Sequence, residues 1–306
     1  MPLKLSIVTP CFNRADFIDQ AVQSVRHQWQ DGMEHIIADG GSTDGTLEKL
    51  AQYDHLTVLS EPDKNLYDAV NKGIKAASGD VIGWLNSDDR YLPGAFDAAL
   101  APFEKNATLD MVSAGARLVT LGSEDDSAGS DLFNGPKNKS LVFEDLLFEV
   151  PIINARFFRR QVFDKVGYFS LDFMPASDRE FLMRCALAGV TNQAVGDVVH
   201  EYVLHGGSAT IRGDRTHWAA MARVHLAIAD HYAATPNLSL ENRKALAKFH
   251  SKNALIGAAG ALATAKPVQA FEFVKKGWAK NRLWPFHIFT HLSEWAKRKN
   301  GTSRPN

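Results

Sequence analysis

The chain has 306 residues, a formal net charge of -1 at neutral pH, and 45% hydrophobic and 23% charged residues. This length allows one large domain or two smaller ones, with a substantial buried core. The near-zero net charge argues against a general attraction to nucleic acid, so we expect no nucleic-acid partner. Because the only cysteines are Cys11 and Cys185, we expect no disulfide framework, no cysteine metal cluster and a reducing compartment.

The sequence predicts no membrane-spanning helix. The N-terminal residues are strand-like and too few for a signal peptide, and the longest apolar stretch, at residues 254–265, is short and rich in Ala and Gly. A spanning helix needs about 20 apolar residues. We therefore expect a cytoplasmic protein, and we keep peripheral attachment at the inner face of the cell membrane as a further hypothesis.

Strands and helices alternate through the first 95 residues. We expect strands at residues 3–9, 34–39, 56–60 and 81–85, separated by helices at about residues 17–29, 42–50 and 66–77. This spacing is typical of βαβ units. The predicted fold class is therefore α/β and Rossmann-like, with a mostly parallel central sheet flanked by helices.

Two adjacent carboxylates, Asp88 and Asp89, follow the buried strand that begins at Val81. Carboxylates at the end of a buried strand are costly unless something positive neutralises them. Mg²⁺ and Mn²⁺ prefer oxygen ligands of this kind. One reading is therefore a metal–diphosphate site. The other is a solvated turn in which the two residues cap a helix beginning near Pro93.

Polar clusters follow all four of the expected strands. They lie at residues 9–14, 39–44, 61–64 and 86–89. In open parallel sheets, ligands bind beyond the carboxyl ends of the strands. Four clusters at equivalent positions favour a ligand site over the helix-cap reading.

The alternation fades after residue 95. We expect helices at residues 95–103, 141–148, 161–166 and 179–188, strands at 110–121, 155–160 and 195–202, and a loop or loose hairpin at 122–140. From residue 214 onward only helices are expected, at residues 216–232, 240–264 and 267–280. We therefore divide the chain into a domain at residues 1–213, with halves at 1–95 and 96–213, and a helical region at 214–306.

Four motifs along this first domain resemble family 2 glycosyltransferases of the GT-A fold, and more narrowly the bacterial branch that assembles surface or extracellular polysaccharides. They are Thr9-Pro10-x-Phe12-Asn13-Arg14, the stretch at residues 38–46, the stretch from Ser60 to Gly73, and Gly83-Trp84-Leu85-Asn86-Ser87-Asp88-Asp89. The resemblance covers about residues 3–210, in the order and spacing of the family. The helical region is not part of it.

The resemblance implies a GT-A domain that transfers a sugar with inversion from a nucleotide-diphosphate donor, most commonly a UDP-sugar, assisted by Mn²⁺ or Mg²⁺. The acceptor would be a hydroxyl of a glycan or of a lipid-linked molecule. Carried over by position, the donor-binding residues are Thr9, Pro10, Asn13, Arg14, Asp39, Lys64, Asp68, Asn71, Asn86, Ser87 and Asp89. The implied metal ligands are Asp88 and His205, with His200 as an alternative to His205 and a simple loop histidine as a third reading.

Asp178 matches the position of the family's general base. The alternative role for Asp178 is an N-cap of the following helix. Asn86 stands where the family has the first Asp of its metal motif, so this site has one carboxylate fewer than expected. That substitution keeps open a non-catalytic sugar-nucleotide-binding or assembly subunit. A nucleotidyltransferase is a second alternative, but it would want a Gly-rich basic loop after the first strand, which the sequence lacks.

The C-terminal tail interleaves basic and aromatic residues. They include Lys275, Lys276, Trp278, Lys280, Arg282, Trp284, Phe286, Phe289, Trp295, Lys297, Arg298 and Lys299. Such a pattern suits a helix lying on an anionic membrane surface. The alternative is that the aromatic residues pack on the catalytic domain or across a homodimer.

Overall fold

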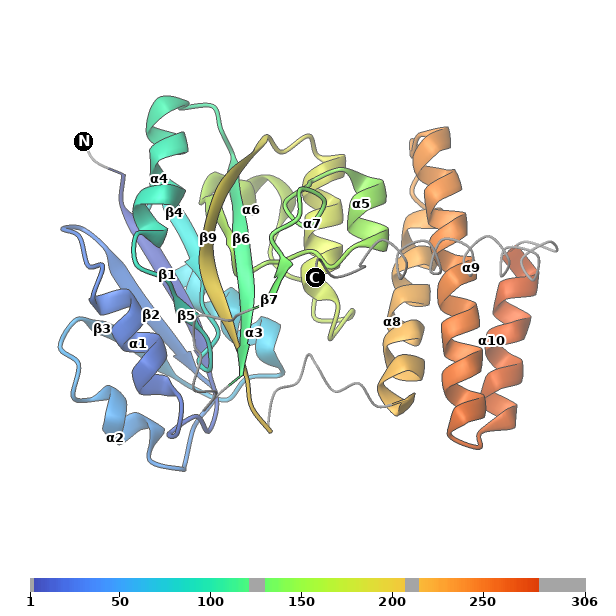
Figure 1. Ribbon diagram of the computed structural model, residues 1–306, viewed down its shortest axis with the longest axis horizontal. Helices are drawn as coiled ribbons and strands as arrows, with labels where there is room; N and C mark the ends of the chain where they lie inside the picture. Colours follow the sequence, from blue (N-terminus) through green and yellow to red (C-terminus); the bar gives the residue numbers. More distant parts are fainter. Residues whose placement is uncertain (1–2, 121–129, 207–214, 281–306) are drawn as a thin grey trace, which may run out of the picture. The chain divides into compact units, whose positions relative to one another are not determined.

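The computed structural model describes residues 3–120, 130–206 and 215–280 (Figure 1). The chain divides into two compact units, Met1–Ala209 and Thr210–Asn306. The first unit contains the sheet and the helices that cover it. In the described part of the second unit, every regular element is a helix. The boundary predicted after residue 213 falls outside the described residues, and the halves predicted at 1–95 and 96–213 stay predictions.

The N-terminal half of the sheet is parallel. Its strands are β1 (Leu5–Cys11), β2 (Glu34–Asp39), β3 (Leu56–Ser60) and β4 (Val81–Trp84), in the order β3-β2-β1-β4. All seven residues of β1 are buried, as expected for a central strand covered on both faces. This half confirms the predicted α/β arrangement.

The rest of the sheet is mixed. Strand β8 (Arg156–Arg159) runs antiparallel to β4 and to β6 (Met111–Thr120), and β6 pairs in parallel with β9 (Asn192–Leu204). Strand β5 (Arg90–Tyr91) runs antiparallel to β9, and β7 (Ser130–Phe133) runs antiparallel to β6. The expectation of a mostly parallel sheet therefore holds for the first half only. Strand β5 was not predicted, because two residues carry no periodicity.

Helices lie on both faces of the sheet (Figure 1). In the first unit they are α1 (Ile18–Arg26), α2 (Thr46–Leu50), α3 (Leu66–Ala76), α4 (Ala95–Lys105), α5 (Phe143–Phe148), α6 (Gln161–Val166) and α7 (Ser177–Leu187). Side chains alternate along β1: Leu5 and Ile7 join the core formed with α1 and α4, whereas Val8 meets α3. The alternation of β1 thus fixes which helix covers which face.

One expectation about a helix end was wrong. Helix α1 begins at Ile18, close to the expected residue 17, and its N-cap Phe17 makes no side-chain capping bond. Helix α7 was expected to begin after Asp178, but it begins at Ser177, so Asp178 lies in its first turn.

The second unit contains α8 (Arg215–Ala233), α9 (Leu240–Ala263) and α10 (Pro267–Lys280), which confirms the predicted helical extension. The Ser239 hydroxyl caps α9 by accepting a bond from the Asn242 N–H at 3.1 Å. The Phe273 ring of α10 lies so close to Gly257 of α9 that a Cβ atom there would be 2.4 Å from it. In the described part of the chain, no helix has the length and apolarity to cross a membrane.

Gly73 offers a test of how α3 packs on β1. An alanine there would place its Cβ atom 2.3 Å from Cγ1 of Val8. We expect Gly73→Ala to lower the free energy of unfolding by about 1–3 kcal/mol, even though alanine favours a helix by about 1 kcal/mol. Urea unfolding measures the change. Gly196→Ala is the control, because its Cβ atom would enter open space. Equal stability of the two variants would contradict this packing.

Candidate active site

The carboxyl ends of β1, β2 and β3 meet around Gly40. A Cβ atom at Gly40 would lie 3.1 Å from Oδ2 of Asp63 and 3.2 Å from Cδ2 of Phe12, so a larger residue there would crowd both side chains. The Phe12 side chain is 57% exposed and offers a flat apolar surface at this edge. Sequence reasoning quoted Phe12 within a motif but gave it no role. Its place directly after a buried strand was the signal that could have revealed it.

Asp39 ends β2 and holds the loop that follows. Its Oδ2 accepts bonds from the N–H groups of Gly41 and Ser42, both at 3.0 Å, and from the Ser60 hydroxyl at 2.7 Å. Its Oδ1 accepts a bond from the Ser42 hydroxyl. Because Asp39 is only 1% exposed, the structure gives it the task of shaping the loop. Its contact with a nucleobase or ribose stays a prediction.

Asn13 and Arg14 join the loops after β1 and β2. The Asn13 N–H donates to the Ser42 hydroxyl at 2.8 Å, and Asn13 Oδ1 accepts a bond from the Thr43 N–H at 2.9 Å. The Arg14 N–H donates to the Thr46 hydroxyl at 2.9 Å. Asn13 is exposed and Arg14 partly so. Both side chains therefore reach the surface at this edge.

Thr9 and Pro10 lie inside the sheet. Both are buried, and the Thr9 hydroxyl is 3.0 Å from Nε2 of the buried His35. Their expected contact with the donor stays a prediction, and the exposed or partly exposed side chains at this edge come from residues 12–14.

The N-terminal turn of α3 carries a charged cluster. The Lys72 ammonium lies 2.7 Å from Asp63, 3.1 Å from Glu61 and 3.8 Å from Asp68. The Asp68 carboxylate also accepts a bond from the backbone N–H of Lys64 at 3.0 Å. This network fixes the loop after β3 and leaves the Lys64 side chain exposed. An exposed cation at this edge suits contact with phosphate.

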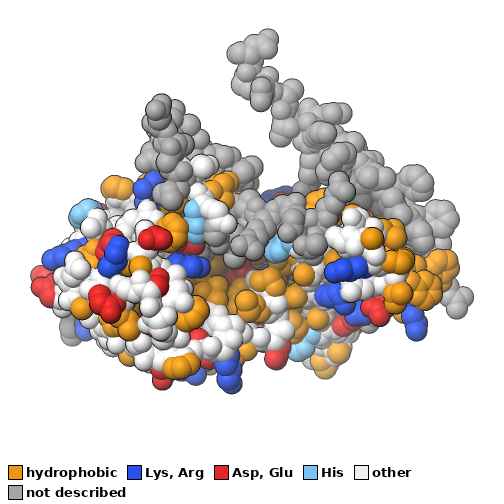
Figure 2. Space-filling view, turned by 90° about the horizontal axis from the view of Figure 1, so that it is seen from below, with side chains coloured by type: hydrophobic (Ala, Val, Ile, Leu, Met, Phe, Trp, Pro, Cys, Tyr) orange, Lys and Arg blue, Asp and Glu red, His pale blue; other side chains and the backbone are white. Residues whose placement is uncertain are grey.

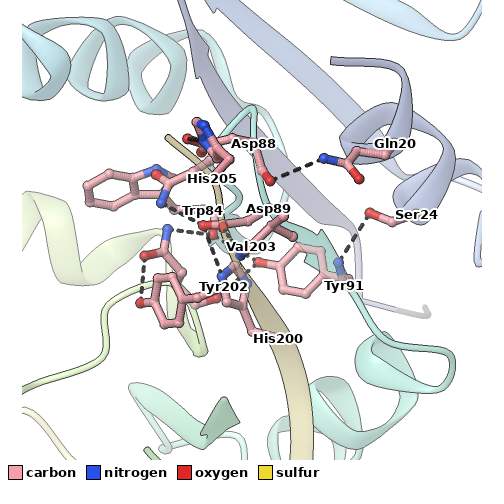
Figure 3. Close-up of polar contacts among 12 residues, drawn as sticks. Gln20, Ser24, Trp84, Asp88, Asp89, Tyr91, His200, Tyr202, Val203 and His205 are labelled. Carbon is pink, nitrogen blue, oxygen red and sulfur yellow. Dashed lines mark hydrogen bonds and ion pairs between the residues drawn. The ribbon is translucent and has the colours of Figure 1, made fainter. Parts of the chain in front are cut away.

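Asp88 and His205 face each other beyond β4 and β9 (Figure 3). His205 Nε2 lies 3.0 Å from Asp88 Oδ2, and the two side chains are 6% and 20% exposed. The imidazole packs on Phe17, with ring centroids 4.2 Å apart. Gln20 Nε2 donates to the Asp88 carbonyl at 3.3 Å. The predicted pair of metal-ligand candidates is thus brought together by two segments 117 residues apart.

Asp89 points the other way, into the protein (Figure 3). Its Oδ1 accepts a bond from the Val203 N–H at 3.0 Å, and its Oδ2 lies 2.8 Å from Asn86 Nδ2 and 3.3 Å from His200 Nε2. The side chain is 4% exposed. Asp89 therefore ties the loop after β4 to β9, and its expected contact with the donor stays a prediction.

Three residues near Asp89 are also held in the interior or bonded to it. Asn86 uses its amide to hold Asp89. Ser87 is only 5% exposed, so little of it faces solvent. His200 is fully buried against Asp89, and its alternative assignment as the metal ligand stays a prediction. Of the histidines considered, His205 is the one beside Asp88.

Glu201 reinforces the attachment of β9. Its buried carboxylate lies between the guanidinium groups of Arg90 on β5 and Arg117 on β6. Two cations offset the cost of burying this charge. The strand that leads to His205 is therefore held from both sides.

Asp178 lies in the first turn of α7, beside the donor-side helix α3. Its Oδ1 is 3.4 Å from the Tyr67 hydroxyl, which also donates to the Pro175 carbonyl at 2.8 Å. Burial raises the pKa of the Asp178 carboxyl above its usual value, and the neighbouring Arg179 partly opposes that shift. The side chain retains some exposed surface. A raised pKa and residual access suit a group that accepts a proton.

Asn71 does not face the donor edge. Its Nδ2 donates to the Phe169 carbonyl at 2.8 Å, and its Oδ1 accepts a bond from the Phe169 N–H at 3.0 Å. The residue is 8% exposed. Asn71 therefore holds the loop that leads to α7, and its expected contact with the donor stays a prediction. Tyr67, which lies between this loop and Asp178, was not predicted as a site residue, whereas its charged neighbour Asp68 was.

An aromatic cluster connects the two parts of the site. Tyr67 packs edge-on against Trp84, with ring centroids 6.0 Å apart, and stacks on Phe169 at 5.8 Å. Trp84 ends β4, four residues before Asp88. The base candidate and the metal-ligand candidate thus share one rigid set of supports.

Figure 2 shows acidic, basic and apolar side chains interspersed on the visible described surface of the first unit. Across residues 3–120, 130–206 and 215–280, no group of three or more His, Cys, Asp and Glu side chains could hold a metal ion. Asp88 and His205 would therefore supply two ligands and leave the rest to substrate and water.

Comparison with known proteins identifies the family. Residues 6–167 match the sequence profile of glycosyl transferase family 2. The chain belongs to this family. It is 36% identical over 186 residues to an uncharacterised glycosyltransferase of Mycobacterium tuberculosis, covering 60% of this chain and 69% of that one. It is 26% identical over 212 residues to the chondroitin synthase of Escherichia coli, covering 68% of this chain but only 30% of the synthase.

Solved structures confirm the GT-A fold of this family 2 glycosyltransferase. Residues 1–349 of TarS from S. aureus, in complex with UDP-GlcNAc, give a TM-score of 0.61 at 15% identity, covering 94% of this chain and 92% of that one. The mannosyltransferase PcManGT from Pyrobaculum calidifontis, in complex with GDP-Man and Mn²⁺, gives 0.62 at 18% identity, covering 100% and 89%. At these identities the likeness establishes the fold alone.

The two adjacent carboxylates should differ in their effect on stability. We expect Asp89→Asn to lower the free energy of unfolding by about 1–3 kcal/mol, because an amide cannot satisfy the buried donors that Asp89 holds. Asp88→Asn, partly exposed, should change it by less than about 1 kcal/mol. Urea unfolding at neutral pH measures both. A larger loss for Asp88→Asn than for Asp89→Asn would contradict the assignment.

Proposed function

We propose that this glycosyltransferase moves a sugar, with inversion, from a nucleotide-diphosphate donor to a hydroxyl group, with Asp178 as the general base. The observation that carries the proposal is the position of Asp178, a partly exposed carboxylate of raised pKa that contacts the donor-side helix α3. The acceptor hydroxyl gives its proton to Asp178 while its oxygen attacks the anomeric carbon. The bond from that carbon to the diphosphate oxygen breaks, and the diphosphate leaves with the electron pair.

A divalent cation fits the Asp88–His205 pair. The donor set is one carboxylate and one imidazole 3.0 Å apart, and both groups bind Mn²⁺, while Mg²⁺ suits the carboxylate better. When bound, the cation would offset the charge that develops on the leaving diphosphate. Asn86 adds no charge here, since an amide is neutral, and its Nδ2 donates to Asp89.

The edge around Gly40 suits the nucleotide of the donor. The exposed ring of Phe12 offers a stacking surface for a base, and exposed Lys64 and partly exposed Arg14 offer cations to phosphate. Structures of similar proteins contain UDP-GlcNAc in one case and GDP-Man in another, so both nucleotides are candidates. UDP is our first choice.

We propose that the acceptor is a glycan or a lipid-linked molecule in surface or extracellular polysaccharide synthesis. The similarity to chondroitin synthase supports a polysaccharide context. A non-catalytic sugar-nucleotide-binding subunit is the competing function, and it is motivated only by Asn86.

Asp178→Asn tests the base. We expect kcat for transfer to fall about 10²- to 10⁴-fold, because an amide cannot take the acceptor proton, while the affinity for UDP with Mn²⁺ stays unchanged. Transfer from a labelled UDP-sugar and calorimetry measure the two quantities. Asp172→Asn, which changes an exposed carboxylate on the loop that leads to α7, is the matched control. Transfer by Asp178→Asn at the native rate would falsify the base assignment.

We further propose that α10 and the following tail contact an anionic membrane surface. Residues 281–306, which hold most of the predicted basic and aromatic residues, lie outside the described part of the chain. Within α10, Trp278 is 54% exposed, Phe271 is 68% exposed, and Lys275 and Lys276 are exposed. Exposed aromatic groups beside lysines suit the interface of an anionic bilayer.

Vesicle flotation tests this contact. We expect the full chain to float with phosphatidylserine-containing vesicles and not with neutral ones, because the lysines are attracted to anionic lipid. Reversing Lys275 and Lys276 to Glu should abolish flotation. The same reversal at Lys244 and Lys248, which are exposed on α9, should not. No flotation of the native chain, or equal loss in both double variants, would refute the membrane contact.

A further inference from the structure

Helix α3 holds the loop at residues 168–176, which leads directly into α7. Asn71 makes a reciprocal pair of bonds with the Phe169 backbone, at 2.8 and 3.0 Å. One turn earlier, the Tyr67 hydroxyl lies 2.8 Å from the Pro175 carbonyl and 3.4 Å from Asp178 Oδ1. The loop is therefore fixed at both of its ends by one face of α3.

The other side of the same turn faces the donor edge. Asn65 caps α3 by accepting bonds from the N–H groups of Tyr67 and Asp68. Asp68 in turn accepts the bond from the Lys64 N–H, and Lys72 connects Asp68 with Asp63. A group bound by the loop at residues 61–64 would thus be joined to Tyr67 through one short, capped helical turn.

We propose that Tyr67 is a positioning residue for the transfer reaction, and that its hydroxyl fixes the Asp178 carboxylate relative to the donor-binding loop at residues 61–68. The proposal rests on the proposed role of Asp178 as the base. It assigns to Tyr67 no contact with substrate. Its effect is exerted through the Pro175 carbonyl and the Asp178 carboxylate.

The Tyr67 hydroxyl can serve both protonation states of Asp178. Its one proton lies closer to the Pro175 carbonyl, and it is shared with Asp178 Oδ1 when that carboxylate is charged. After Asp178 has taken the acceptor proton, its O–H can donate to the Tyr67 oxygen, while the Tyr67 O–H donates to the Pro175 carbonyl. Burial and the charge of Asp178 raise the pKa of Tyr67 well above its usual value, so the phenol keeps its proton throughout.

Three neighbouring groups act on the charge of Asp178. Burial raises the pKa of its carboxyl, whereas Arg179 on the same helix and the Tyr67 hydroxyl on α3 lower it. Tyr202 on β9 also interacts with Asp178, and its own pKa is raised. Arg179 is held by the carbonyls of Leu146 and Glu149. Removal of the Tyr67 hydroxyl alone should therefore raise the pKa of Asp178.

Tyr67→Phe tests the proposal, because it removes the hydroxyl and keeps the ring that packs on Trp84 and Phe169. We expect kcat to fall about tenfold, with KM for the donor unchanged. A base works when deprotonated, so the acidic limb of the kcat/KM profile should move to higher pH. Steady-state transfer rates, measured at about three pH values per unit between about pH 5 and about pH 9, report both effects.

Tyr53→Phe is the matched control, since it removes a tyrosine hydroxyl that donates to another carboxylate, that of Asp19, at 3.0 Å. It should leave the rate and the pH profile at native values. A native rate and profile in Tyr67→Phe would overturn the proposal. So would a lower rate with an unmoved acidic limb and a lowered melting temperature, because those together indicate a purely structural role.

The failure of this proposal can be told apart from a failure of the proposed function. If Asp178→Asn still transfers sugar at the native rate, then Asp178 is not the base, and Tyr67 has no base to position. If Asp178→Asn loses transfer and Tyr67→Phe behaves like the native enzyme, then only the role of Tyr67 is wrong.

Discussion

The site depends on a single buried carboxylate, that of Asp89. By accepting the Val203 N–H and contacting His200, Asp89 ties the loop after β4 to the last strand of the sheet. Because its neighbour Asp88 then points outward, the end of β9 brings His205 to within 3.0 Å of it. Of the two adjacent carboxylates, Asp89 therefore holds the loop in place, and Asp88 is the candidate metal ligand.

Helix α3 gives the site its second constraint. One side of its first turns organises the charged loop after β3, through Lys72 and Asp68. The other side holds the loop at residues 168–176, through Asn71 and Tyr67. Gly73 allows this helix to lie directly on Val8 of the central strand. The relative position of the donor edge and Asp178 is thus set by one well-packed helix rather than by flexible loops.

Local patterns were enough to predict the fold of the parallel half and the helical extension. Apolar runs followed by polar clusters are properties of single segments, and β2 and β3 were predicted with their observed bounds. The mixed half was harder, because the two-residue β5 exists only through its pairing with β9.

The candidate site shows the same limit. A sequence can indicate that Asp88, Asp89, Asn71 and Asp178 are polar residues in suggestive places, but not which way each side chain points. Asp89 and Asn71 face inward because partners from distant segments, Val203 and Phe169, present backbone groups to them. Those partners are apolar residues without any motif. A sequence motif therefore predicts which residues lie near the site, whereas hydrogen bonds between distant segments determine the role of each residue.

The most direct test is a crystal structure of the protein soaked with UDP and Mn²⁺, with anomalous data collected at the manganese edge. The account predicts one strong anomalous peak within coordination distance of Asp88 and His205, a diphosphate bound to it, and the base of the nucleotide at the Phe12 and Gly40 edge. A manganese ion bound elsewhere, or a nucleotide that leaves this edge empty, would contradict it.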